Sequence, residues 1–529
     1  MYLLLGVCAP EKVHPLSFPF EKRIYTREVT LPVASSAARP ADSVVERVRA
    51  YRLANEHRIV RELTDLLAIP NVASDTVNIQ RNATKLAEML ERRGIQTQLL
   101  AIPGRGPVVF GRLDTPGATR GVIFYLHYDG QPVNATEWVD TKPFEPALRN
   151  ATIQASGKLI PSPEPPTPYQ DEWRLYARSA ADDKGPIIAL LAALDALHAQ
   201  KIPLAVNLKI LLDGEEENGS PNLERTLLAH RELLRADALI AADGPVHQSG
   251  QPLVYFGNRG ILGVEITVYG PVRPLHSGHY GNWAPNPAMR LAQLLATMED
   301  NDGGVLIEGF YDDVAPLGEA ERRAIAAMPK NEAELARELG FAQPEGGGKR
   351  LGELINLPSL NVRGLRSADV GKDARTVIPD RAVASLDLRL VKDVQPDREF
   401  ERLVAHIRKQ SYYVTQNEPT AEERAKYPRI ARVVKDVWNY PATHTSMDLP
   451  VSRAVVEVVE HATGHGIVQM PTLGGSVPMY IFENLHLPVI GVPTVNYDNN
   501  QHNANENLRI GNLWSGIEIF AALLAELRW

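Results

Sequence analysis

The sequence predicts an α/β protein with a mostly parallel sheet, helices on both sheet faces, and an inserted α+β domain. Apolar runs typical of buried strands alternate with amphipathic helical stretches between residues 43 and 242, which favours a parallel sheet. After Gly257 the pattern changes to alternating apolar and polar residues, as in half-exposed antiparallel strands. A chain of 529 residues also exceeds one comfortable hydrophobic core, so we expect more than one domain.

The elements follow in order along the chain. The first part contains predicted helices at 43–67, 77–93, 186–198 and 222–234, and predicted buried strands at 121–126, 206–212 and 238–242. The part after Gly257 contains predicted strands at 261–269 and 383–390, helices at 287–298 and 399–410, and a loop-rich stretch at 301–352. The last part returns to the first pattern, with a helix at 450–463, a strand at 487–492 and a helix at 512–527.

This order predicts a discontinuous main domain that is interrupted by an insertion. We assign residues 1–40 to an N-terminal tail, 41–256 and 446–529 to the main domain, and 257–445 to the inserted domain. The apolar run at residues 2–9 is too short to span a bilayer, and no other segment of the sequence predicts a membrane span. We therefore expect a cytoplasmic protein, or an exported one if the apolar run is the remnant of a signal.

Composition excludes several classes of protein. The formal net charge of -8 and the pI near 6.0 argue against nucleic-acid binding, which needs clustered Lys and Arg. Cys8 is the only cysteine, so the chain has no internal disulfide and no cysteine-rich zinc site. Any bound metal must therefore be held by His, Asp and Glu side chains.

Acidic and histidine side chains follow the predicted buried strands. His127 and Asp129 come after the first strand, the acidic run 213–217 after the second, and Asp243 after the third. Ligands bind beyond the carboxyl ends of strands in such sheets. Taken alone, Asp182 also fits a helix N-cap and His502 a solvated loop residue. The acidic run is harder to explain without a cation, because its like charges repel one another.

Eight sequence blocks occur in order between about residue 120 and the end of the chain: LHYDGQPV, ADDKGP, LLDGEEENGSPNL, LHSGHYG, TVIP, LDLRLV, LGGSVPMY and the loop around His502. Together they resemble the di-zinc metallopeptidase family of carnosinases, glutamate carboxypeptidases and succinyl-diaminopimelate desuccinylases. The similarity is strongest to the carnosinase-like dipeptidase branch. One departure is Arg178 to Ala181, which replaces a Gly-rich tripeptide of the family.

The resemblance implies a role for each residue of the site. It implies two divalent metal ions, most simply Zn²⁺ with Mn²⁺ or Co²⁺ as alternatives, and a water activated between them. The implied metal ligands are His127, Asp182, Glu217, Asp243 and His502. Glu216 would be the general base, and Asp129 would orient His127. The motif Asn218-Gly219-Ser220 sets the register of the glutamates, and a cis peptide is implied between Asp182 and Asp183.

The resemblance further implies how substrate is held. His276 matches a histidine that reaches across a homodimer to the scissile carbonyl. Arg389, Gly475, Ser476 and, less closely, Thr376 match positions that hold a substrate carboxylate. The implied activity is hydrolysis of dipeptides or short peptides with a free C-terminal carboxylate. Two alternatives remain open: an amidase acting on N-acyl amino acids, and a catalytically silent peptide-binding homologue.

Overall fold

The computed structural model describes residues 43–101 and 104–529, so the predicted tail and Cys8 lie outside the described residues. The larger sheet has eight strands in the spatial order β1-β2-β7-β3-β8-β20-β9-β19. Its strands are β1 (Gln96–Leu100), β2 (Val108–Leu113), β3 (Gly121–His127), β7 (Asn207–Asp213), β8 (Ala238–Ala241), β9 (Leu253–Tyr255), β19 (Val468–Met470) and β20 (Val489–Gly491). The central strands β7, β3, β8 and β20 are parallel to one another. The pairs β1–β2 and β2–β7 on one side, and β20–β9 on the other, are antiparallel.

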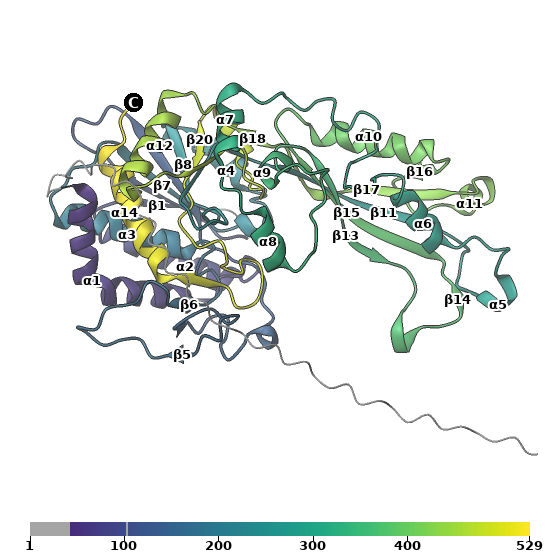
Figure 1. Cartoon of the computed structure of the whole chain (residues 1–529), viewed down its shortest axis with the longest axis horizontal. Coiled ribbons are helices and arrows are strands. Elements are labelled where there is room, and N and C mark those ends of the chain that lie inside the picture. Colours follow the sequence, from purple (N-terminus) through teal and green to yellow (C-terminus); the bar gives the residue numbers. More distant parts are fainter. Residues whose placement is uncertain (1–42, 102–103) are drawn as a thin grey trace, which may run out of the picture. The chain divides into compact units, whose positions relative to one another are not determined.

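Helices cover both faces of this sheet, as the alternating pattern predicts (Figure 1). One face packs against α1 (Val44–Leu67), α2 (Thr76–Glu91), α3 (Lys184–Ala199), α12 (Pro450–Thr463) and α14 (Ile510–Glu526). The other face packs against α4 (Leu223–Ala229) and α13 (Tyr480–Glu483). Successive side chains of β3 enter the two cores in turn, because neighbouring residues of a strand point to opposite faces.

A second, five-stranded sheet is built from residues after Gly257, in the order β13-β15-β11-β17-β16. Its strands are β11 (Gly260–Tyr269), β13 (Ser359–Arg366), β15 (Arg381–Leu390), β16 (Tyr413–Thr415) and β17 (Ile430–Tyr440). Alternate residues of β11 and β15 pack with α6 (Pro287–Leu295) and α10 (Pro396–Lys409) in one core. The sheet is antiparallel except between β16 and β17, as the period-two pattern predicts.

Small sheets and short helices complete the fold. Two two-stranded sheets pair β10 (Gly257–Asn258) with β18 (Thr443–His444) and β12 (Leu275–His276) with β14 (Val377–Ile378). A four-stranded sheet joins β21 (Asn507–Arg509), β6 (Arg174–Tyr176), β4 (Ala147–Arg149) and β5 (Leu159–Ile160). No helix of the described residues is long and apolar enough to cross a membrane.

The predicted fold class is confirmed, with two corrections to its elements. The stretch 301–352 is not simply loop-rich, since it contains α7 (Glu319–Ala327), α8 (Glu332–Leu339) and the start of α9 (Leu351–Leu354). Good helix formers in Glu319–Ala327 and the capping glutamate Glu321 explain α7. The predicted helix at 222–234 breaks at His230 and continues as a short 3₁₀ turn. The domain boundaries themselves stay a prediction.

Candidate active site

The candidate site lies at the carboxyl edge of the central parallel strands. Strand β3 ends at His127, β7 ends at Asp213 beside it, and Asp243 follows β8. Because these strands run in the same direction, their last residues meet at one edge. The loop after β6 brings Asp182 to His127, with 2.8 Å between the Nε2 and carboxylate oxygen atoms.

Two groups of potential metal ligands form at this edge. One group contains His127, Glu216 and Asp243, and the other contains Asp182, Glu217 and His502. Within each group the ligand atoms all lie within 4.8 Å of one another. The structure therefore brings together the five predicted metal ligands and the predicted base, which come from five separate stretches of the chain.

Burial and mutual repulsion perturb the acids of the site. Burial, and then the charge of Asp182, raises the pKa of Glu217 to about 8 and that of Asp243 to about 6. Burial also raises the pKa of Glu216 well above its ordinary value. Burial alone would raise the pKa of Asp182 too, but hydrogen bonds from His127 and His502 hold it below its ordinary value. Such a concentration of buried acids favours binding of cations.

The histidines of the site are held by these acids. Nε2 of His502 lies 3.2 Å from Asp182 and 3.3 Å from Glu217. A hydrogen bond with Asp182 raises the pKa of His502 to about 9, against the opposite effect of burial. Nδ1 of His127 lies 3.3 Å from the Asp129 carboxylate. The other ring nitrogen, Nε2, faces the Asp182 carboxylate. This is the arrangement expected of a ligand histidine oriented by a carboxylate.

Asp129 also positions the two adjacent glutamates. Its carboxylate oxygens accept the backbone N–H groups of Glu216 at 3.1 Å and Glu217 at 3.0 Å. The side-chain amide of Gln131 donates to the Glu217 carboxylate at 2.7 Å. The strand end at His127 and the 3₁₀ turn with both glutamates are thus fixed by one buried aspartate.

Glu506 holds the loop that carries Asp182, and the sequence did not indicate this role. Its fully buried carboxylate accepts the backbone N–H groups of Ser179 at 2.8 Å and of Ala181 and Asp182 at 3.0 Å each. It also accepts a 2.8 Å hydrogen bond from Nη1 of Arg178. The segment 178–181, which departs from the family pattern, is therefore accommodated, and the implied cis peptide after Asp182 is confirmed.

The donor set fits two divalent ions. Imidazole nitrogens and carboxylate oxygens suit Zn²⁺, Mn²⁺ or Co²⁺, and both groups lack the thiolates that would select softer metals. Three carboxylates would serve as ligands in this scheme (Asp182, Glu217 and Asp243), and they would offset three of the four positive charges of two divalent ions. The residues present therefore fit a dinuclear centre.

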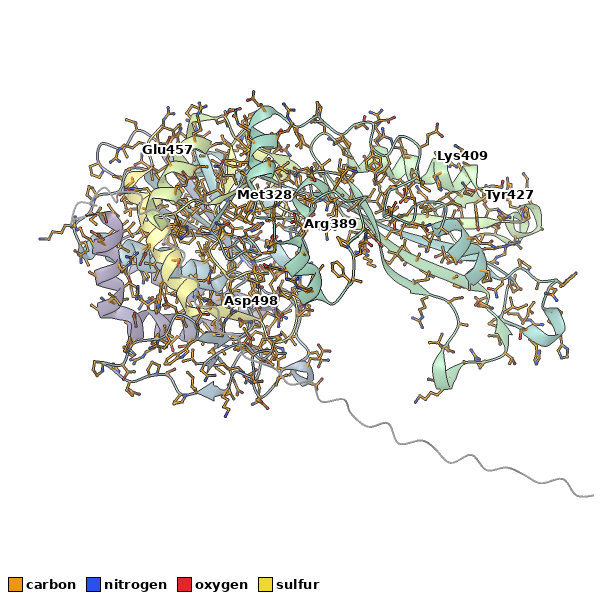
Figure 2. The ribbon with its side chains drawn as sticks, in the orientation of Figure 1. Met328, Arg389, Lys409, Tyr427, Glu457 and Asp498 are labelled. Atoms are coloured by element: carbon orange, nitrogen blue, oxygen red, sulfur yellow. The ribbon has the colours of Figure 1, made fainter. Side chains whose placement is uncertain are left out.

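A cavity of about 320 Å³ opens onto these ligands. Two predicted substrate residues, Gly475 and Ser476, line it. Arg389, which is labelled in Figure 2 and lies near the end of β15, donates to Oγ of Ser476 at 2.7 Å. Arg259 lies nearby with its side chain largely buried, and burial together with the charge of Arg389 lowers its pKa to about 10. Sequence reasoning missed Arg259, although two neighbouring guanidinium groups favour an anion there.

Two other predicted site residues, the catalytic His276 and the substrate-binding Thr376, lie elsewhere in the chain. His276 and Thr376 are both exposed, and Ser277 N–H donates to the carbonyl of Thr376 at 2.9 Å. His276 lies in β12, Thr376 directly precedes its antiparallel partner β14, and the ring centroids of His276 and His279 lie 4.5 Å apart. Neither residue lines the cavity of the same chain.

This fold, with clustered acids and imidazoles at the carboxyl edge of its sheet, defines a metal-dependent hydrolase. The family model described as peptidase family M20/M25/M40 matches residues 123–526, and the chain belongs to this family. It is therefore a metallopeptidase, as the sequence predicted.

Individual relatives agree with this assignment. The chain is 27% identical over 493 residues to the Cys-Gly metallodipeptidase dug1 of Schizosaccharomyces pombe, covering 88% of this chain and 95% of the relative. It is 25% identical over 524 residues to the human Beta-Ala-His dipeptidase, covering 93% and 94%. Among solved structures, the M20 family metallo-carboxypeptidase Sso-CP2 of Sulfolobus solfataricus aligns with a TM-score of 0.72 and 29% identity, covering 88% and 98%. These matches confirm the resemblance to the carnosinase-like dipeptidase branch.

Proposed function

We propose that the protein hydrolyses dipeptides that carry a free C-terminal carboxylate, with two divalent ions, most simply Zn²⁺, held by His127, Asp182, Glu217, Asp243 and His502. The observation that carries this proposal is the pair of ligand groups that opens into a cavity of dipeptide size. The names of the relatives support a dipeptide substrate, since they act on Cys-Gly and Beta-Ala-His.

The residues around the cavity have different roles in the proposed reaction. The bound ions would supply an activated water and polarise the scissile carbonyl. Glu216 takes a proton from the attacking water and delivers it to the nitrogen of the leaving amine. Two bound dications would offset the effect of burial on the pKa of Glu216, so that its carboxylate would be ionised and able to accept the proton. Asp129 keeps His127 and the Glu216 backbone in place throughout.

The substrate carboxylate would be bound beside the cavity by Arg389 and Ser476. Arg389 already donates to Ser476, so both groups are oriented before substrate arrives. Arg259 adds a buried guanidinium beside the half-buried Arg389, and its backbone N–H donates to the carbonyl of Gly475 at 3.1 Å. A carboxylate bound there would relieve the repulsion between the two arginines.

The test of this function combines substrate choice with metal removal. The purified protein is expected to hydrolyse Cys-Gly and Beta-Ala-His more rapidly than their C-terminally amidated forms, because amidation removes the anion that Arg389 binds. Chelation should abolish turnover, and added Zn²⁺, Mn²⁺ or Co²⁺ should restore it. Turnover that survives complete removal of metal, confirmed by elemental analysis, would contradict the proposal.

We also propose that the active unit is a homodimer in which His276 completes the site of the partner. In each chain His276 is exposed and away from its own cavity. The variants His276→Ala and Glu216→Gln should each be nearly inactive. When the two are mixed and exchange subunits, about a quarter of the wild-type activity should return, since half of the dimers contain one intact site. Mixtures that stay inactive although mass analysis shows mixed dimers would contradict a role in trans.

A further inference from the structure

The part of the cavity not occupied by metal ligands or the Gly475-Ser476 turn has an apolar wall. This wall consists of Val246, Leu253, Ile355, Met470 and Leu473. Leu253 and Met470 come from β9 and β19, at the edge of the eight-stranded sheet, and Ile355 follows α9. Three separate stretches of the chain thus bring aliphatic side chains to one surface beside the metal ligands.

An apolar core supports this wall from behind. Leu253, Ile355 and Met470 pack with Ile325 and Met328 in one cluster, and Leu473 packs against it. Figure 2 labels Met328, which follows α7. Leu253 is 2% exposed and Met470 is 5% exposed, so these side chains have little room to move aside for a polar group. The wall is therefore a preformed apolar surface of fixed shape.

The charges that line the cavity lie among the metal ligands and the base. The carboxylates among its described lining residues are Asp182, Glu216 and Asp243, and its lining contains neither lysine nor arginine. His247 also lines it, and burial lowers the pKa of this histidine, which keeps its ring neutral near pH 7. A charged substrate side chain would find no partner against this wall, and burying an unpaired charge is costly.

We infer that this wall binds an aliphatic, uncharged side chain on the acyl side of the scissile bond. With the C-terminal carboxylate of a dipeptide at Arg389 and Ser476, the residue left to occupy the rest of the cavity is the acyl residue. The inference rests on the proposed function, and it defines the class of dipeptide: an aliphatic N-terminal residue followed by a residue with a free carboxylate.

The test compares dipeptides that share a C-terminal glycine. For the metal-loaded protein, kcat/KM for Leu-Gly and Met-Gly is expected to exceed that for Gly-Gly by about 10–200-fold. This is the range over which a hydrophobic pocket discriminates between larger and smaller apolar side chains. Asp-Gly and Lys-Gly should be cleaved no better than Gly-Gly. Equal kcat/KM for Leu-Gly and Asp-Gly would overturn this inference alone. Failure to hydrolyse any dipeptide would refute the proposed function as well.

A pair of charge variants tests the position of the subsite. Leu473→Lys should lower the ratio of kcat/KM for Leu-Gly over Asp-Gly at least 10-fold, and Leu473→Asp should do the same for Leu-Gly over Lys-Gly. Leu339→Lys is the matched control, because Leu339 is 61% exposed on α8 and should leave both ratios unchanged. Circular dichroism establishes that the variants fold. Folded Leu473 variants with the wild-type ratios of kcat/KM would overturn the assignment. If the variants do not fold, the kcat/KM values of the wild-type protein for the dipeptides with C-terminal glycine test the inference instead.

Discussion

Replacing Glu216 by glutamine is expected to lower kcat for dipeptide hydrolysis by about 10²–10⁴-fold, the usual contribution of a general base. The amide keeps the size of the side chain but cannot accept the proton of the attacking water. Because Glu216 lies with His127 and Asp243, it is close enough to the metal ligands to act on such a water. Steady-state kinetics with a dipeptide, at saturating metal, measures the loss.

The matched control is Glu217→Gln, which changes the neighbouring residue in the same way. Glu217 belongs to the ligand group with Asp182 and His502, so this variant should lose one of the two bound ions. Glu216→Gln should keep both, as measured by elemental analysis after dialysis. Loss of one ion in Glu216→Gln, with both retained in Glu217→Gln, would exchange the roles of the two residues.

Strong local patterns in the sequence place some of the candidate metal ligands at the ends of strands. Apolar runs stop at His127 and at Asp213, which marks the ends of those two strands. Because the strands are parallel, their carboxyl ends lie at the same edge of the sheet. The same argument located Asp243 after β8. His502 has no such pattern, since it lies in an irregular loop, and only the family resemblance indicated it.

Contacts between distant loops could not be predicted in this way. The role of Glu506 depends on the fold bringing its loop against residues 178–182, more than 300 positions earlier. Arg259 has the sequence pattern of an ordinary strand arginine, and its burial next to Arg389 appears only in the packed structure. Strand β17 was also missed, because its charged residues interrupt the apolar pattern of Ile430–Tyr440.

Removing the Glu506 carboxylate is expected to destabilise the fold. Glu506→Ala would leave the buried guanidinium of Arg178 and three backbone N–H groups without their acceptor. Breaking a buried ion pair by removing one partner costs about 3–5 kcal/mol, so the free energy of unfolding should fall by this amount. Urea denaturation of the metal-free protein measures the change. Glu457→Ala, on the exposed side of α12, is the control and should have little effect (Figure 2).

The same carboxylate should also control metal affinity, because two of the N–H groups it binds belong to Asp182 and the residue before it. Glu506→Gln keeps the side-chain shape but offers one carbonyl oxygen in place of two carboxylate oxygens. Loss of such support typically lowers metal affinity about 10–100-fold, and calorimetric titration with Zn²⁺ should detect this. A purely structural role would lower stability and leave the affinity of the folded protein unchanged. The expected result for Glu506→Gln is therefore weaker binding at a temperature where the protein is fully folded, and unchanged affinity there would restrict Glu506 to folding.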